Sequence, residues 1–547
     1  MTSAAADRLA RANALALLAE NVILSWGWRR RVIAFGSGAV GALAMPPFAM
    51  FPVMIAPMSV AVWLIDGSAD RSDGRRAVAG LLAAFGTGWW IGLGYFLAGL
   101  WWVGAACLVD AEKFLWAVPF SVLALPAALA FFPAFGCALA RLLWLPGPLR
   151  VFALAFGLGV SEWSRGLLLT GFPWNDLGMA LGANLTLAQL ASIIGLHGLT
   201  FLSIAIFATP ATLWSVGEHR MFPAPTILAA LALLLVAGYG ALRLEAPASQ
   251  TVPDAKLRII QPNVSQDASF APENKDAILH RYFLLSARDA NGRTDGARGV
   301  THLIWPESAF PFILSRDAQT ISDIADFLRS GATLITGAAR LDSDGNGDPV
   351  YFNSIEVLDR NGLTRERYDK QHLVPFGEYL PFERWLDRAG ITQFVQFPGG
   401  FSPGSGPRVL RVPGLPAALP MICYEAIFTA EIGDIFSGTR RPGWMLNLTD
   451  DAWFGLTPGP YQHYAQARLR AIELGIPLVR VANSGRSAVV DGLGREIAFA
   501  PLGLEAVLDF ELPKPLPPTW QSRLGSLGAA LIAAVLLLVC LIARQKL

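Results

Sequence analysis

Residues 419–425 have the sequence LPMICYE, an apolar run that ends in a thiol, Cys423, followed by Tyr424 and a carboxylate, Glu425. A short continuous apolar run of this kind is typical of a strand buried in a parallel sheet or a sandwich. Residues 426–436 have a helical pattern, so we expect Cys423 where a strand gives way to a helix. The dipole and free N–H groups of a helix N-terminus favour the thiolate, the nucleophilic form of cysteine. This position therefore favours a reactive thiol.

From residue 250 to residue 515 the sequence shows the same pattern, in which short β-rich runs alternate with amphipathic helices. This pattern predicts an α/β domain. The predicted strands are residues 257–262, 302–305, 332–336, 354–358, 419–423, 444–448 and 478–481, and the predicted helices are residues 273–289, 318–329, 426–436 and 461–474. Several polar residues of interest directly follow predicted strands, where α/β folds usually build their sites.

Two further segments of this domain carry charged groups suited to catalysis. Glu307 lies in WPES (305–308), and Lys370 and Glu378 lie in DKQHLVPFGE (369–378). A carboxylate, an ammonium and a thiol can act as base, oxyanion stabiliser and nucleophile. Taken alone, Glu307 is equally consistent with a residue that only caps a turn. Lys370 and Glu378 are equally consistent with an ordinary solvated ion pair. Sequence spacing leaves open whether the three groups converge.

The rest of the chain has the composition of a membrane protein. Of 547 residues, 53% are hydrophobic and 16% are charged, which is unusual for a soluble globular protein. Charge-free stretches long enough for a helical span of roughly 20 residues are residues 32–65, 77–109, 114–140, 177–217, 221–242 and 524–543, with a shorter span at 151–165. Prolines at 46, 47, 52 and 57 predict that the first stretch is a hairpin of two short spans.

These patterns predict four parts: a cytoplasmic N-terminal segment at 1–30, a transmembrane domain of about seven helices at 31–245, the α/β domain at 250–515 and a C-terminal transmembrane helix at 522–543. Residues 1–30 lack the short apolar core and cleavage site of a signal peptide. Arginine clusters fall on alternate connections between the spans, and cytoplasmic loops carry the excess of positive charge. Both termini are therefore predicted to be cytoplasmic and the α/β domain to lie on the opposite side.

Composition also argues against several classes of function. The formal net charge is +1 with no long basic run in the hydrophilic part, so we expect no nucleic-acid partner. The cysteines at 107, 137 and 540 lie in apolar stretches, so Cys423 has no disulfide partner in the α/β domain. His302, His372 and His463 could serve a cysteine–histidine hydrolase, but no local signature supports this. No cluster has metal-ligand spacing, so we expect no metal and no cofactor.

The motifs WPES, DKQHLVPFGE and ICYE resemble the glutamate–lysine–cysteine triad motifs of the nitrilase superfamily. The segments VPFGEYLP (374–381), DDAWFGLTPGPYQH (450–463) and RAIELGIPLVRVANSG (470–485) resemble those of apolipoprotein N-acyltransferases in particular. EWSRG (162–166) and TGFPW (170–174) extend this resemblance to the apolar half. The resemblance implies a multi-pass α-helical membrane domain and a nitrilase-like catalytic domain, an αββα sandwich.

The resemblance also implies roles for individual residues: Glu307 as general base, Lys370 as oxyanion stabiliser and Cys423 as nucleophile, with Glu378, Tyr424 and Glu425 in support. Phe270 stands where family members often carry tryptophan, which implies aromatic gating of the site. Asp450 stands where the family pattern has asparagine.

The implied reaction transfers an acyl chain from a glycerophospholipid to the N-terminal amine of the S-diacylglyceryl cysteine of an apolipoprotein, through a thioester on Cys423. It would be the last step of lipoprotein maturation, in the bacterial inner membrane with the catalytic domain in the periplasm. The alternative is a membrane-tethered, nitrilase-type amidase that acts on a small C–N substrate. A receptor or scaffold built on an inactive nitrilase fold is disfavoured by the presence of all three triad residues.

Overall fold

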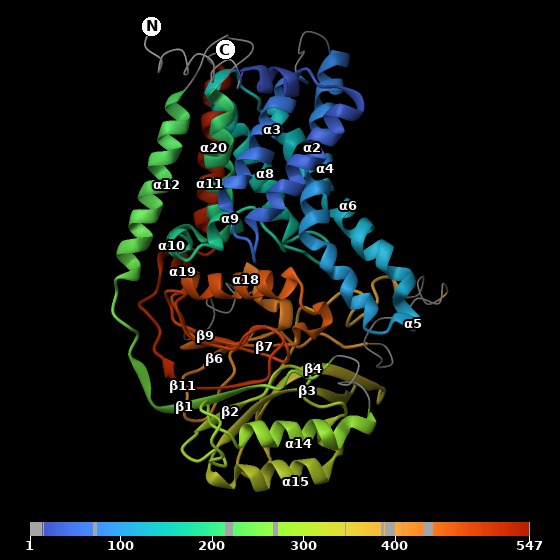
Figure 1. Ribbon diagram of the computed structural model, residues 1–547, viewed down its shortest axis with the longest axis vertical. Coiled ribbons are helices and arrows are strands. Elements are labelled where there is room, and N and C mark those ends of the chain that lie inside the picture. Colours follow the sequence, from blue (N-terminus) through green and yellow to red (C-terminus); the bar gives the residue numbers. More distant parts are fainter. Residues whose placement is uncertain are drawn as a thin grey trace. The chain divides into compact units, whose positions relative to one another are not determined.

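The computed structural model describes residues 14, 16–68, 74–213, 223–265, 272–344, 346–383, 388, 400–406, 408–429 and 441–545 (Figure 1). The chain divides into two compact units. The first combines Met1–Ala246 with Arg523–Leu547, and the second is Pro247–Ser522. The second unit is thus inserted in the sequence between two helices of the first, α12 (Pro223–Leu244) and α20 (Leu527–Gln545).

The first unit is helical. Within the described ranges, five helical segments are long and apolar enough to cross a membrane: Ala77–Leu108, Ala111–Leu142, Ala191–Leu213, Pro223–Leu244 and Leu527–Gln545. Shorter helices include α2 (Gly27–Gly41), α3 (Ile55–Asp66) and α8 (Arg150–Arg165). The proline-rich first stretch forms two helices, α2 and α3, in place of one rod. The count of about seven spans stays a prediction.

Close helix contact in this unit depends on small residues. A Cβ atom on Gly38 of α2 would overlap the carbonyl oxygen of Ile91 in α4 (Gly74–Leu100). Small residues at a helix interface let the two backbones approach closely, and this increases the van der Waals contact between apolar helices. At the end of α8, Arg165 pairs with Glu162 at 2.6 Å, both buried, and also donates to the carbonyl oxygens of Phe172 and Trp174. The pair therefore has a structural role in shaping this turn.

The second unit contains two mixed sheets among its described residues. The six-stranded sheet has the order β11-β1-β2-β3-β4-β5, and the five-stranded sheet has the order β10-β9-β8-β7-β6. Strands β1, β2 and β3 are parallel, as are β6, β7 and β8, and the remaining pairs are antiparallel. The strands are β1 (Thr251–Gln261), β2 (His302–Ile304), β3 (Thr333–Ser343), β4 (Pro349–Leu358), β5 (Thr364–Asp369), β6 (Ala418–Ile422), β7 (Trp444–Thr449), β8 (Leu478–Ala482), β9 (Ala488–Val490), β10 (Glu496–Phe499) and β11 (Ala506–Pro513).

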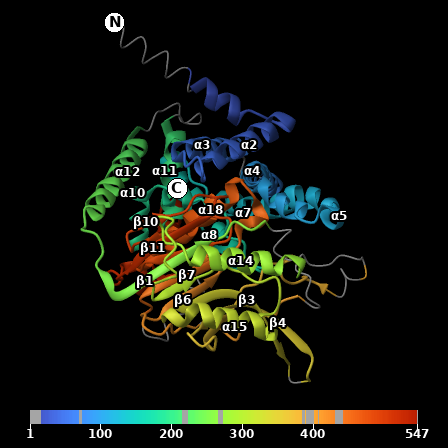
Figure 2. The same cartoon turned by 60° about the horizontal axis from the view of Figure 1, so that its bottom comes forward.

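The sheets pack face to face, and helices cover their outer faces. One buried cluster joins Ile304 and Ile355 of the first sheet to Leu448 and Val481 of the second. A second cluster lies between the six-stranded sheet and helices α14 (Lys275–Ser286) and α15 (Ala318–Phe327), and a third lies between the five-stranded sheet and α18 (Pro458–Leu474). Figures 1 and 2 show these four layers. The predicted fold class, an αββα sandwich together with a helical unit, is confirmed.

Four strands were absent from the sequence-based prediction, and one predicted helix differs. β5 has the sequence TRERYD and lies at a sheet edge, so it lacks the apolar run of a central strand. The short β9 and the outer strands β10 and β11 were also missed. The predicted helix at 426–436 differs at its start, where Cys423–Ile427 form a short 3₁₀ turn. Residues 430–440 of this prediction lie outside the described residues.

Candidate active site

The ends of neighbouring strands bring the predicted site residues together. Glu307 follows β2, Lys370 follows β5 and Cys423 follows β6. The charges of Glu307 and Lys370 both act on the thiol of Cys423. The structure thus gathers the three groups in the second unit, whereas Phe270 lies outside the described residues.

Cys423 occupies a constrained turn. Its φ angle is +53°, in the left-handed region that residues other than glycine seldom adopt. Its carbonyl oxygen contacts Asn447 Nδ2 and His463 Nε2, each at 3.1 Å. Taken as a whole residue Cys423 is half-buried, whereas Cys107, Cys137 and Cys540 are buried. Strained backbone of this kind persists only where the surroundings enforce it, and it is concentrated at functional sites.

Glu307 is buried and its carboxylate is held at both oxygens. Oε1 accepts from Asn353 Nδ2 and Oε2 accepts from the backbone N–H of Asp450, both at 2.8 Å. A Cβ atom on Gly337 of β3 would lie 2.5 Å from Glu307 Cα, so only glycine allows this close approach. Burial raises the pKa of Glu307, and the positive charge of Lys370 offsets this only in part. A carboxylate with a raised pKa is a more effective base near neutral pH.

Lys370 is 1% exposed and its ammonium lies between two carboxylates. Nζ is 2.9 Å from Glu378 Oε2, 3.0 Å from Glu378 Oε1 and 3.7 Å from Glu307 Oε1. Asn353 bridges the two carboxylates, since its Nδ2 also donates to Glu378 at 2.8 Å. Burial would lower the pKa of Lys370, but the charges of Glu378 and Glu307 outweigh burial and raise it. Lys370 therefore stays an ammonium and provides a fixed positive charge beside the thiol.

The resting state of Cys423 differs from the sequence-based expectation. Burial raises the pKa of the thiol, the charge of Glu307 raises it further, and Lys370 opposes this only in part. The expectation that a helix N-terminus lowers this pKa is therefore wrong. The physical reason is that Cys423 begins a 3₁₀ turn of five residues, which aligns few peptide dipoles, while the desolvated thiol lies near a carboxylate. The thiol needs a base to become a nucleophile.

Tyr424 and Glu425 hold two loops together. Glu425 Oε1 accepts from Tyr368 Oη at 3.0 Å and from the backbone N–H groups of Gln371 at 2.8 Å and His372 at 3.2 Å, while Oε2 accepts from Ile422 N at 2.7 Å. Tyr424 Oη donates to the carbonyl oxygen of Leu373 at 2.5 Å. These contacts tie the segment that carries Lys370 to the turn that carries Cys423.

A buried ionic network beneath Cys423 was not predicted from the sequence. Asp451 Oδ2 accepts from Arg480 at 2.7 Å and its Oδ1 is 2.9 Å from His463 Nδ1, with all three side chains fully buried. Burial would raise the pKa of Asp451, but Arg480 and His463 lower it well below its usual range. His463 Nε2 contacts the carbonyl oxygen of Cys423, a positioning contact rather than that of a base. The sequence feature that could have revealed this network is Arg480, an arginine inside the apolar strand β8.

Asp450, the neighbour of Asp451, has a different environment. Its Oδ1 accepts from Ala452 N at 3.0 Å and from Asn483 Nδ2 at 3.2 Å. Burial, together with the charge of Glu307, raises the pKa of Asp450 to about 7. A carboxyl with a pKa of about 7 thus adjoins the catalytic candidate Glu307, whose own pKa is raised by burial.

Both units match models of known protein families. The model of the apolipoprotein N-acyltransferase N-terminal domain matches residues 37–209, and the model of the carbon-nitrogen hydrolase family matches residues 298–516. An apolipoprotein N-acyltransferase of Rhodopseudomonas palustris is 48% identical over 98% of this chain and 99% of its own length, and one of Bradyrhizobium diazoefficiens is 48% identical over 95% and 96%. An amidase from Nesterenkonia sp. AN1 with an acetamide moiety added covalently at its active site cysteine has 17% identity, covers 49% of this chain and 94% of its own, and gives a TM-score of 0.33.

The second unit is therefore a carbon-nitrogen hydrolase domain of the nitrilase-like class, as its αββα layers and the matched model agree. The whole chain, including its apolar helices, belongs to the apolipoprotein N-acyltransferase family, a family of acyltransferase enzymes. The resemblance noted from the motifs is thereby confirmed.

Proposed function

We propose that this protein transfers an acyl chain from a glycerophospholipid to the N-terminal amine of the S-diacylglyceryl cysteine of apolipoproteins, through a thioester on Cys423. The observation that carries the proposal is the buried cluster of Glu307, Lys370 and Cys423 in a unit whose two ends continue in sequence into apolar helices. The names of the relatives support N-acylation of lipoproteins.

In the first half-reaction, Glu307 accepts the proton of the Cys423 thiol, and the thiolate attacks the carbonyl carbon of a phospholipid ester. The ammonium of Lys370 stabilises the oxyanion of the tetrahedral intermediate. The intermediate collapses as the ester C–O bond breaks. Glu307 returns the proton to the leaving alkoxide, so a lysophospholipid departs and an acyl thioester remains on Cys423.

In the second half-reaction, the α-amine of the lipoprotein attacks the thioester carbonyl and Glu307 takes a proton from the attacking nitrogen. Lys370 again stabilises the oxyanion. The C–S bond breaks, an amide forms, and the proton held by Glu307 returns to the sulfur of Cys423. Each turnover thus restores the neutral thiol that the raised pKa of Cys423 favours in the resting site.

We place the enzyme in the bacterial inner membrane, with both termini in the cytoplasm and the catalytic unit in the periplasm. The charge pattern of the connections supports this orientation. Both proposed substrates carry acyl chains anchored in the membrane. A catalytic unit joined at each end to apolar helices therefore meets its substrates in a confined layer rather than in free solution.

The test is intact mass spectrometry of the purified protein after incubation with phospholipid. Wild type and Cys107→Ala, a control for a buried membrane cysteine, are expected to gain one acyl mass that hydroxylamine removes, whereas Cys423→Ala gains none. Turnover of a small amide by protein that forms no acyl adduct with phospholipid would instead establish the amidase alternative.

A further inference from the structure

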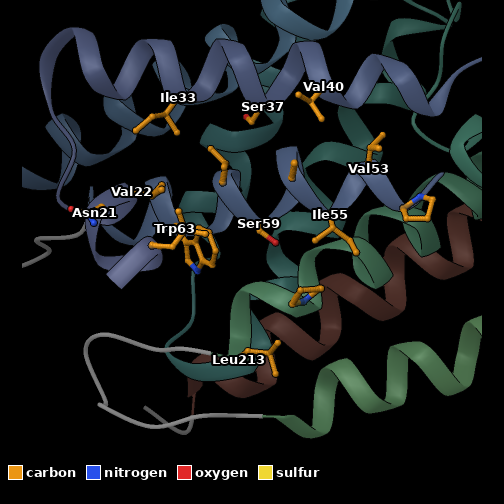
Figure 3. A pocket seen from close by; sticks show the side chains of 15 residues that line it. Asn21, Val22, Ile33, Ser37, Val40, Val53, Ile55, Ser59, Trp63 and Leu213 are labelled. Carbon is orange, nitrogen blue, oxygen red and sulfur yellow. The ribbon is translucent and has the colours of Figure 1, made fainter. Parts of the chain in front are cut away.

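A groove in the first unit lies between α2 and α3 and is bordered by residues 18–22 and by the 3₁₀ segment Thr209–Leu213 (Figure 3). Its volume is about 780 Å³, within the range of small-molecule sites. Apart from Asn21, Ser37 and Ser59, the lining side chains are apolar. All of the lining residues belong to the first unit, so the groove is separate from the cluster around Cys423.

Helical periodicity produces the groove. Ile33, Ser37 and Val40 recur at intervals of four and three on α2, and Ile55, Ser59 and Trp63 recur at intervals of four on α3, so each set forms one face of its helix. Figure 3 shows these two faces turned toward the same space. An apolar space of this size that stays empty forfeits the dispersion contacts of its lining, so a hydrocarbon chain is the occupant that its surface favours.

One buried hydroxyl on this wall lacks a partner. Ser59 is 5% exposed, and its Oγ makes no hydrogen bond with any described residue. By contrast, the Oγ of Ser37 donates to the carbonyl oxygen of Ala34 at 2.8 Å. Buried polar groups are almost always hydrogen-bonded. The Ser59 hydroxyl is therefore suited to donate to an acceptor on an otherwise apolar ligand, such as the carbonyl of an acyl ester.

Tryptophan and arginine side chains lie at the start of α2, at one end of the groove. Trp26 and Trp28, at the start of α2, are 82% and 69% exposed, as expected at the boundary between lipid and water. Arg29 lies one turn before Ile33 on the same face of α2 and is exposed. Arg29 lies over the ring of its neighbour Trp28 at 5.9 Å. Arg31 lies over the ring of Trp90 at 6.0 Å, and its position two residues further along α2 points it away from the face of Ile33.

Distances along the helices fit a phospholipid. Arg30 donates to the carbonyl oxygen of Leu64 at 2.7 Å, so the start of α2 is level with the end of α3. Ser59 is one helical turn, roughly 6 Å, deeper than Trp63. A phosphate beside Arg29 therefore places the ester of its acyl chain near Ser59 and the chain itself along Ile55 and Val40.

We infer that this groove is a binding site for a glycerophospholipid, with its phosphate on Arg29, an ester carbonyl on Ser59 and one acyl chain between α2 and α3. This lipid is distinct from the acyl donor. The site rests on the proposed membrane placement, by which the lipid belongs to the cytoplasmic leaflet, and not on the proposed chemistry at Cys423.

The experiment uses the full-length enzyme in phosphatidylcholine nanodiscs with phosphatidylglycerol that carries a diazirine in one acyl chain. After irradiation, peptide mapping is expected to find label within residues 33–63. Arg29→Gln should reduce this label about tenfold, the effect of losing one charge-assisted hydrogen bond. Ser59→Phe should abolish it by filling the groove, and Ser59→Ala should reduce it less. Arg31→Gln is the matched control and should keep the label.

Equal label in wild type and Ser59→Phe, or an equal loss in Arg29→Gln and Arg31→Gln, would overturn the site. A headgroup-free diazirine alkane that labels residues 33–63 as well as the phospholipid does would reduce the groove to a general hydrocarbon cavity and overturn the phospholipid assignment. Cys423→Ala should retain the label, so failure of the proposed acyl transfer is distinguishable from failure of this site. Gel filtration of each variant checks that it is folded.

Discussion

Glu378→Gln is the sharpest test of how the site holds its positive charge. Among the described residues, every group that is hydrogen-bonded to this carboxylate is a donor. Oε1 accepts from Lys370 and Asn353, and Oε2 accepts from Lys370 and from the backbone N–H of Val374. The amide of glutamine replaces one oxygen by an NH₂ group. Whichever way the amide is turned, that group faces two donors.

Two magnitudes follow. Breaking a buried ion pair costs about 3–5 kcal/mol, and the lower end applies because Glu307 remains 3.7 Å from Lys370. At roughly 2–4 °C per kcal/mol for a domain of this class, the transition temperature should fall by about 6–12 °C. The ammonium also loses its nearest anchor, and loss of an oxyanion donor costs about 10²- to 10³-fold in rate. The acylation rate should therefore fall by up to that factor.

The assay follows thioester formation on Cys423 by intact mass after rapid mixing with phospholipid, together with thermal unfolding of each variant. Glu356→Gln is the matched control because Glu356 is 7% exposed against 6% for Glu378, and among the described residues its carboxylate accepts from Thr364 Oγ1 alone, at 3.2 Å. The control should acylate at the wild-type rate. Folded Glu378→Gln that acylates within about threefold of wild type would refute the view that this carboxylate positions the oxyanion stabiliser.

Three further predictions concern charge in the same unit. Lys370→Ala should reduce the rate of Cys423 acylation by about 10²- to 10³-fold at unchanged pH, because the oxyanion loses its stabilising ammonium. A smaller loss in single-turnover acylation would show that Lys370 is not the oxyanion stabiliser. The pKa of Asp450 is raised to about 7, against about 3.9 unfolded, so its contribution to stability is present below pH 4 and is lost as the pH rises toward 7. Asp450→Asn should remove the fall in transition temperature that this carboxyl causes between about pH 4 and pH 7. If the transition temperatures of variant and wild type depend on pH in the same way, the prediction is wrong. Arg480→Met removes the arginine partner of the buried Asp451, which keeps its contact with His463, and should cost about 3–5 kcal/mol. Asp451→Asn in the same chain should restore part of this loss in denaturant unfolding, and purely additive losses would show that the two side chains are not coupled.

Much of this architecture could be predicted because its signals are local. An apolar run marks a buried strand or a membrane helix wherever it is placed, and the seven predicted strands correspond to β1, β2, β3, β4, β6, β7 and β8. Edge strands were missed for the same reason: TRERYD in β5 buries little and so carries no apolar run. Motifs around Glu307, Lys370 and Cys423 indicated the chemical groups, but their spacing in sequence said nothing about distance in space.

Only the tertiary structure decided how those groups behave. The pKa of the Cys423 thiol depends on burial and on Glu307, which follows a strand of the other sheet, so a local helix argument pointed in the wrong direction. The buried network of Asp451, His463 and Arg480 joins residues from three different elements. The groove between α2 and α3 exists only because the proline-rich connection turns the two helices side by side. Periodicity and composition are properties of the chain, whereas electrostatic fields, cavities and burial arise from residues that are distant in sequence and adjacent in space.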